Sequence, residues 1–132
     1  RRIGDRSNRM PSSQEVANFI GSTFHSVWAL ELLFYLRQHR ERELSHADMV
    51  SGLRGSDLVV TQSLGSLAAA GLILVNKDGS ARYSPTTEQL DSLVEKTRIL
   101  YARSPDKVRR MIIAGTSSGL SAFADAFKLR KD

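Results

Sequence analysis

The apolar segment over residues 27–36, VWALELLFYL, constrains the fold of this chain more than any other feature. Its length, which extends to about residue 39, and its content of Leu and Ala favour an α-helix over a strand. Because the segment is apolar on nearly every side, other elements must surround it. The chain has 132 residues, which suits one domain, so we expect this helix to be its centre. Its aromatic residues are expected in the core, with a small-molecule pocket as the alternative: Trp28, Phe34 and Tyr35.

Two shorter helices flank the central one in the sequence. The first is predicted over about 13–20, with Gly21 interrupting it. The second is predicted over about 46–53, because Ser45 and Asp48 have the spacing of a capping box. The apolar positions of each are expected to be buried: Val16, Phe19 and Ile20 in the first, and Ala47, Val50 and Leu53 in the second.

The hydrophobic period changes from helical to extended near Gly71. Before it, Ser56 is the predicted cap of a helix over 57–70, whose buried face carries Val60, Leu64 and Leu67. After it, residues 72–75 and 81–84 read as two short strands joined by a hairpin turn at Asp78-Gly79. The pattern therefore predicts a helix followed directly by a β-hairpin.

Helical patterns continue to the end of the chain. A helix is predicted over 87–103, and Pro105 starts another. The first of these carries an apolar stripe that packs either on its own domain or on a second copy, and we expect a homodimer: Leu90, Leu93, Val94, Thr97, Leu100 and Tyr101. A short amphipathic segment follows a Gly/Ser-rich stretch, and the 119–132 tail is a candidate site for a protein partner.

Residues 56–73, SDLVVTQSLGSLAAAGLI, resemble the recognition helix and first wing strand of MarR/ArsR-like winged helix-turn-helix transcriptional regulators. The shared features are a leading Ser, small and polar residues, Leu-x-x-Leu and a closing Gly-Leu-Ile. The resemblance implies a mainly α fold with a small β-hairpin wing and helical extensions at both ends. The expected divisions are a basic arm with a short helix (1–22), the winged domain (23–85) and a C-terminal helical extension (86–132).

The resemblance implies a sequence-specific regulator that binds double-stranded DNA with its third helix in the major groove. Base contacts are expected from Thr61, Gln62 and Ser66 on the outer face of that helix. Lys77 and Arg82 of the wing would hold phosphate or the minor groove. The remaining expected DNA-binding residues are Ser45, Ser56 and Asp57 near helix starts, and Arg1, Arg2, Arg6 and Arg9 of the arm.

The charge distribution supports a polyanionic partner but leaves the third helix neutral. The net charge is +5, and the four arm arginines stand against Asp5 alone. Residues 96–110 hold six basic side chains against Asp106, whereas residues 56–70 hold only the acidic Asp57. The neutral helix keeps an alternative open, in which the winged helix is a protein–protein interaction module without base readout.

Several classes of function are not expected. The chain has no cysteine, which excludes a disulfide scaffold and a cysteine nucleophile. The three histidines, His25, His39 and His46, are scattered without metal-ligand spacing. No nucleophile elbow or phosphate loop is present, so we expect neither an enzyme nor a cofactor. Apolar runs are too short to cross a membrane, and we expect a cytoplasmic protein without membrane contact.

Overall fold

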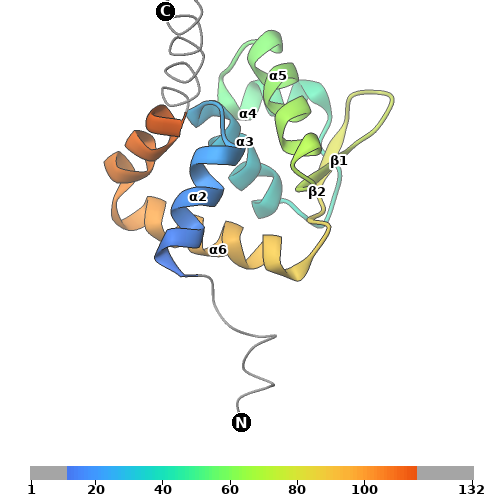
Figure 1. Ribbon diagram of the computed structural model, residues 1–132. Helices are drawn as coiled ribbons and strands as arrows, with labels where there is room; N and C mark the ends of the chain where they lie inside the picture. The colour runs from blue at the N-terminus through green and yellow to red at the C-terminus, as the bar shows by residue number, and fades with distance from the viewer. Residues whose placement is uncertain (1–11, 116–132) are drawn as a thin grey trace, which may run out of the picture.

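Helix α3 (Val27–Gln38) lies at the centre of the computed structural model, which describes residues 12–115 (Figure 1). The hydroxyl of Ser26 caps the helix by accepting a bond from the Ala29 N–H at 3.2 Å. Phe34 and Tyr35 are partly buried against the core, whereas Trp28 is 42% exposed. The expectation of a core position was therefore wrong for Trp28. Five side chains are fully buried: Ala29, Leu30, Leu32, Leu33 and Leu36.

Helix α2 (Ser13–Thr23) crosses the last described helix, residues 105–115, at close range. A reciprocal capping box between Ser12 and Glu15 starts α2. The predicted interruption at Gly21 was wrong, because α2 continues through it to Thr23. A Cβ at Gly115 would collide with the backbone carbonyl of Gly21. Gly115 therefore permits a close crossing over the Gly21 backbone, a tertiary role that local propensity does not reveal.

Helices α4 (His46–Leu53) and α5 (Asp57–Ala69) pack on α3 and on each other. The capping box of Ser45 and Asp48 is present, as predicted. The expected buried face of α4 was partly wrong, because Met49 is fully buried and Ala47 is exposed. The longer Met side chain fills the space between the helices. In α5 the predicted inner face is confirmed: Val60, Leu64 and Leu67 are buried, together with Ser63.

A two-stranded antiparallel sheet follows α5. Strand β1 (Ile73–Val75) pairs with β2 (Ala81–Tyr83), and Leu74 lies opposite Arg82. Gly71 adopts a φ of +78°, so the chain leaves the helix in a conformation that favours glycine. On the other edge, Leu44 and Ala81 exchange two backbone hydrogen bonds of 2.9 Å. The segment before α4 thus adds a one-residue bridge to the hairpin.

Helix α6 (Glu88–Arg103) covers the core on the side away from the hairpin loop (Figure 1). Thr87 caps it by accepting a bond from the Leu90 N–H at 3.1 Å. Of its apolar stripe, Val94 and Thr97 are fully buried within the chain. The other four members pack partly buried against the same core: Leu90, Leu93, Leu100 and Tyr101. The stripe therefore packs on its own domain, and Val94 and Thr97 are not available to a second copy.

The described part of the chain is mainly helical with a small antiparallel sheet, as predicted. One hydrophobic cluster joins α2, the segment from α3 to β2, α6 and the helix over 105–115. Within residues 12–115, no single helix is long and apolar enough to cross a membrane. The arm arginines Arg1, Arg2, Arg6 and Arg9 and the 119–132 tail lie outside the described residues.

Candidate nucleic-acid interface

The outer face of α5 is exposed along its length and carries no charge beyond its first residue. Residues at positions i, i+4 and i+7 share one line on a helix, so Leu58, Gln62 and Gly65 form the middle of this face. Thr61 and Ser66 flank that line. Thr61 and Gln62 are exposed and Ser66 is half-buried. We call this surface the α5 outer face, defined by these five residues.

The α5 outer face joins a shallow groove on one side. Gln62 and Ser66 line an open space of about 330 Å³ whose other wall includes His25 and Trp28. The Ser66 hydroxyl lies 3.5 Å from the backbone carbonyl of Thr23, to which it donates. Ser66 is thus partly engaged within the fold, whereas Gln62 projects freely among the described residues. Of the predicted base-reading residues, Thr61 and Gln62 are the best placed to contact a partner.

The start of α5 is fixed to α4. Ser56 caps α5 by accepting a bond from the Val59 N–H at 3.1 Å. The Asp57 carboxylate lies 2.8 Å from Nε2 of His46, the first residue of α4. Ser45 is engaged in its own capping box, where its N–H donates to Asp48 and its hydroxyl accepts from the Asp48 N–H. These caps orient both helix starts but occupy the groups that the sequence suggested for phosphate contact.

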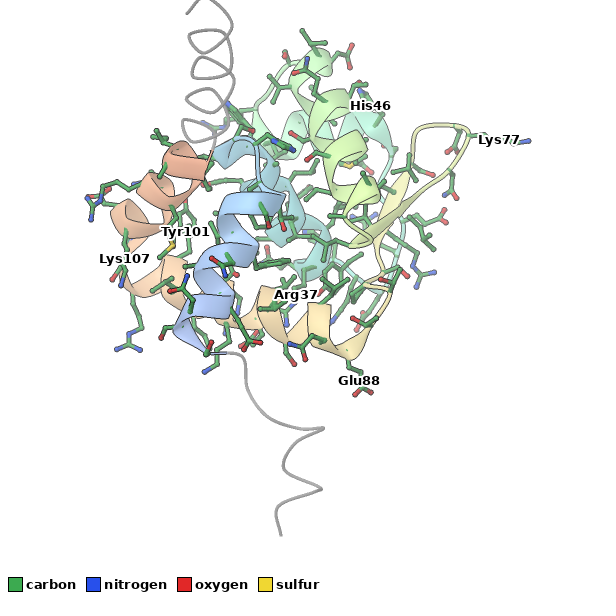
Figure 2. All side chains as sticks on the ribbon, in the orientation of Figure 1. Arg37, His46, Lys77, Glu88, Tyr101 and Lys107 are labelled. Carbon is green, nitrogen blue, oxygen red and sulfur yellow. The ribbon has the colours of Figure 1, made fainter. Side chains whose placement is uncertain are left out.

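The hairpin carries two exposed cations. Lys77 projects from the loop tip (Figure 2), and Arg82 is exposed on β2. Within residues 12–115, neither forms an ion pair. Asp78 accepts two bonds from Ser80, whose hydroxyl and N–H lie 2.7 and 2.9 Å away. The Ser80 hydroxyl lowers the pKa of Asp78, and this bonding turns the carboxylate back into the loop.

Sequence reasoning placed Gly65 on the outer face of the third helix but missed two residues of this surface, Leu58 and Arg54. Leu58 is 64% exposed in the middle of the α5 outer face. A Cβ added at Gly65 would meet no other described atom within 4 Å, so packing within the described fold does not require glycine there. Arg54 is exposed in the turn before α5 with a φ of +58°. The spacing of Leu58 from Gln62 was a signal available in the sequence, while the position of Arg54 required the turn.

The second basic cluster lies elsewhere. Lys107 is on the opposite side of the view from Lys77 (Figure 2). Arg98 forms a two-point pair with Glu95, with N–O distances of 2.7 and 3.1 Å. Arg109 pairs with Asp106 at 2.8 Å. Lys107 is thus remote from the hairpin tip, and Arg98 and Arg109 are paired with carboxylates. The exposed cations next to α5 are Arg54 in the preceding turn and Lys77 and Arg82 on the hairpin.

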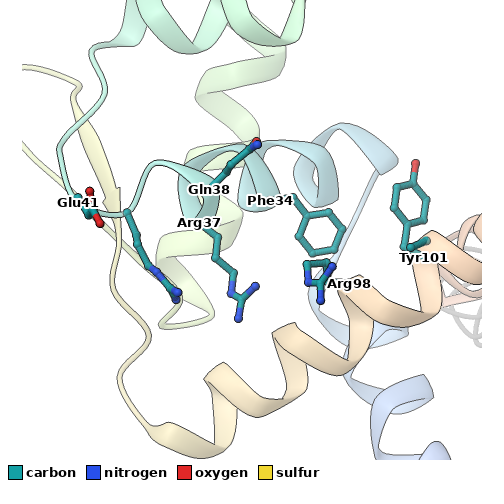
Figure 3. A pocket seen from close by; sticks show the side chains of 8 residues that line it. Phe34, Arg37, Gln38, Glu41, Arg98 and Tyr101 are labelled. Carbon is teal, nitrogen blue, oxygen red and sulfur yellow. The ribbon is translucent and has the colours of Figure 1, made fainter.

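An open cleft of about 570 Å³ separates the end of α3 from α6 (Figure 3). Phe34 and Tyr101 line it, with ring centroids 5.9 Å apart. The guanidinium groups of Arg37 and Arg98 also line it, and both bind Glu95. Of the three aromatic residues considered for a ligand pocket, Phe34 lines this cleft, whereas Trp28 and Tyr35 do not. Its paired charges fit a structural network that fastens α6 to α3.

Two pKa shifts follow from that network. Bonding to Arg98, together with the charge of Arg37, lowers the pKa of Glu95. Burial and the hydrogen bond donated to Asp91 at 2.5 Å raise the pKa of Tyr83. Both residues therefore keep their ordinary ionisation states at neutral pH.

Comparisons with known proteins add no information on function to the geometry described above. No family model, no curated protein and no solved structure matches this chain. Within residues 12–115, no group of three or more His, Asp or Glu side chains is arranged to hold a metal ion. The α5 outer face with its neighbouring hairpin is the surface from which a function can be argued.

Proposed function

We propose that this chain is a winged helix-turn-helix protein that binds double-stranded DNA in a sequence-specific manner and regulates transcription in the cytoplasm. The observation that carries the proposal is an exposed helix face beside a projecting, cationic hairpin. The order of elements supports it: α3, the bridging residue Leu44, α4, α5, β1 and β2 follow one another as in a winged helix. This order matches the resemblance carried by residues 56–73.

The proposed mechanism divides binding between α5 and the hairpin. The α5 outer face enters the major groove, where the Gln62 amide pairs with N6 and N7 of adenine. Thr61 reaches a neighbouring base or phosphate. Lys77 and Arg82 contact the backbone or minor groove, and Arg54 contacts phosphate next to the start of α5. Phosphate contacts supply most sequence-independent affinity, so a neutral reading helix is compatible with tight binding.

The α5 outer face also fits DNA by its shape. Glycine inside a helix costs about 1 kcal/mol relative to alanine. Gly65 bears this cost although a Cβ there would lie in open space among the described atoms. A partner that approaches the α5 backbone closely explains the glycine, because the missing Cβ leaves room for that partner. The edge of a base pair or a sugar in the major groove is such a partner.

Homodimerisation belongs to the proposal as a symmetric way to read two half-sites. Because Val94 and Thr97 are buried within the chain, a dimer contact would use other surfaces. Segments outside the described residues, including the 119–132 tail and the arm arginines, supply additional partner or phosphate contacts in this proposal.

The test is selection of bound sequences from a random duplex pool at low salt, followed by affinity measurement. We expect the wild type to enrich a motif with adenine at a fixed position. Gln62→Ala should relax that position and lose about 1–3 kcal/mol of discrimination. Gln89→Ala removes another exposed amide, on α6, and should leave the motif unchanged. Absence of any enriched motif at low salt would contradict sequence-specific binding.

A second candidate is a protein-interaction module, and a specific observation favours it. The α5 outer face is neutral, and its middle carries the exposed Leu58, a feature also common at protein interfaces. Salt distinguishes the two functions. Affinity for DNA falls steeply as salt rises, whereas binding through a neutral apolar surface changes little.

A further inference from the structure

We propose that Leu58 reads the C5-methyl group of a thymine in the bound duplex. This inference rests on the proposed function, because it assigns a role to a residue on the α5 outer face. Leu58 is the most exposed of the large apolar side chains in the described chain, at 64%. Leu58 follows directly after Asp57, the first residue of α5, and therefore lies on the helix and not in a loop.

The position of Leu58 on the helix supports the assignment. The inner face of α5 is set by Val60, Leu64 and Leu67, all buried. At about 100° per residue, Leu58 points nearly opposite to that inner face. It precedes Gln62 by four residues, or about 6 Å along the helix axis. The two side chains therefore project in one direction and would meet base pairs one or two steps apart, given a rise of about 3.4 Å per step.

The chemistry of the major groove identifies the ligand group. Adenine presents a donor and an acceptor that suit the Gln62 amide, and thymine presents a methyl group. That methyl is the apolar group on a normal base edge that a leucine can cover. Gly65 lies on the same line with no side chain, so the backbone there can approach the groove floor. From Leu58 through Gln62 to Gly65, the α5 outer face thus presents an apolar side chain, an amide and bare backbone. This order favours a site rich in A·T pairs.

The neighbouring charges favour DNA over a protein as the occupant. Lys77 and Arg82 are exposed on the adjoining hairpin, and Arg54 is exposed in the turn before α5. Within residues 12–115, none of the three forms an ion pair. Three unpaired cations around a neutral, partly apolar strip match a duplex, whose phosphates flank its base edges.

The experiment replaces thymine by uracil, which keeps base pairing and removes only the methyl group. Each thymine of the selected duplex is replaced in turn, and binding is measured for wild type and Leu58→Ala. At one position the wild type should lose about fourfold in affinity, the equivalent of about 0.8 kcal/mol for one buried methyl-sized group. Leu58→Ala should bind the thymine and uracil duplexes equally, with the lower affinity.

A matched variant controls for removal of an exposed leucine. Leu74→Ala truncates a leucine of 57% exposure on β1, and it should retain the fourfold thymine preference. Because Leu58 packs little within the fold, thermal unfolding of Leu58→Ala should match that of the wild type.

Four results would overturn the inference. If every uracil duplex binds the wild type as well as thymine does, or if Leu58→Ala keeps the preference, Leu58 does not read the methyl while DNA binding stands. If Leu74→Ala alone removes the preference, the wing reads it. If no duplex binds at low salt, the proposed function itself fails, and the exposed Leu58 favours a protein partner.

Discussion

Glu95 holds together the contact between α3 and α6. Its carboxylate forms an ion pair with Arg37 at 2.9 Å and accepts two hydrogen bonds from Arg98. Arg37 also lies 5.8 Å from the centre of the Tyr83 ring, and Tyr83 in turn donates to Asp91 on α6. These residues connect the central helix, the hairpin and α6, so the network fixes the position of the hairpin relative to the core.

The lowered pKa of Glu95 predicts a particular dependence of stability on pH. A carboxyl whose pKa is lower in the folded state stabilises the fold above its unfolded pKa, whose ordinary value is 4.5. That contribution disappears as the pH falls through the folded pKa. Glu95→Gln should therefore lower the melting temperature by a few degrees at pH 7. It should also reduce the fall in melting temperature between about pH 6 and pH 3.

Glu41→Gln is the matched control for this measurement. Glu41 is exposed at the same cleft and forms no ion pair within residues 12–115. Its variant should follow the wild-type pH profile. Parallel profiles for Glu95→Gln and wild type would show that the Glu95 pairs do not contribute to stability.

At the level of single residues, the sequence predicted caps better than surfaces. Ser45 and Ser56 cap helices as predicted, because a capping bond involves residues three apart in the chain. Thr87 is the cap of α6, although the predicted helix already included it. The engagement of Ser66 with Thr23 required the fold, because these residues are 43 positions apart. Leu58 was overlooked although its spacing from Gln62 places it on the outer face.

At the level of elements, hydrophobic period was sufficient where one face packs on the core. The period predicted α5, the hairpin and α6 closely. It failed at Gly21, where α2 continues to Thr23 and Gly115 of the helix over 105–115 packs against it, a tertiary contact that the local pattern does not show. It also failed on α4, where Met49 and not Ala47 faces inward. Ala47, Met49 and Val50 are all apolar and close together in the sequence, so their spacing fitted more than one buried face.

Replacing the glycine within α5 and replacing the glycine that follows α5 should have opposite effects on stability. Gly65→Ala should stabilise the fold by about 0.5–1 kcal/mol, because alanine favours the helix and its Cβ meets open space. Gly71→Ala should destabilise it by about 1–2 kcal/mol, because φ is +78° and the Cβ would lie 2.9 Å from the Thr86 hydroxyl. Denaturant unfolding measures both.

The same Gly65→Ala variant should bind the selected duplex more weakly. A methyl group placed between the α5 backbone and the groove costs about 1–3 kcal/mol if the contact is close. A more stable protein with lower affinity would locate the contact at this glycine. Equal affinity for variant and wild type would exclude a close approach of DNA to the middle of α5.

At the scale of the whole molecule, the distribution of charge decides which surface a duplex would contact under the proposed function. The sequence revealed the basic residues but not their sides, because the distance between the hairpin and the helix over 105–115 depends on tertiary packing. Lys77 and Lys107 lie on opposite sides of the view in Figure 2. A duplex that contacts α5 and the hairpin therefore meets Lys77 and Arg82 before the distant cluster.

The dependence of affinity on salt tests the central claim most directly. Affinity for the selected duplex is measured over a range of salt for wild type, Lys77→Ala/Arg82→Ala and the control Lys107→Ala/Arg110→Ala. Each lost phosphate contact reduces the slope of log affinity against log salt by about 0.9. The wing variant should therefore have a slope shallower by about 2, with the control unchanged. An unchanged slope in the wing variant, or a loss confined to the control, would contradict DNA binding through α5 and the hairpin.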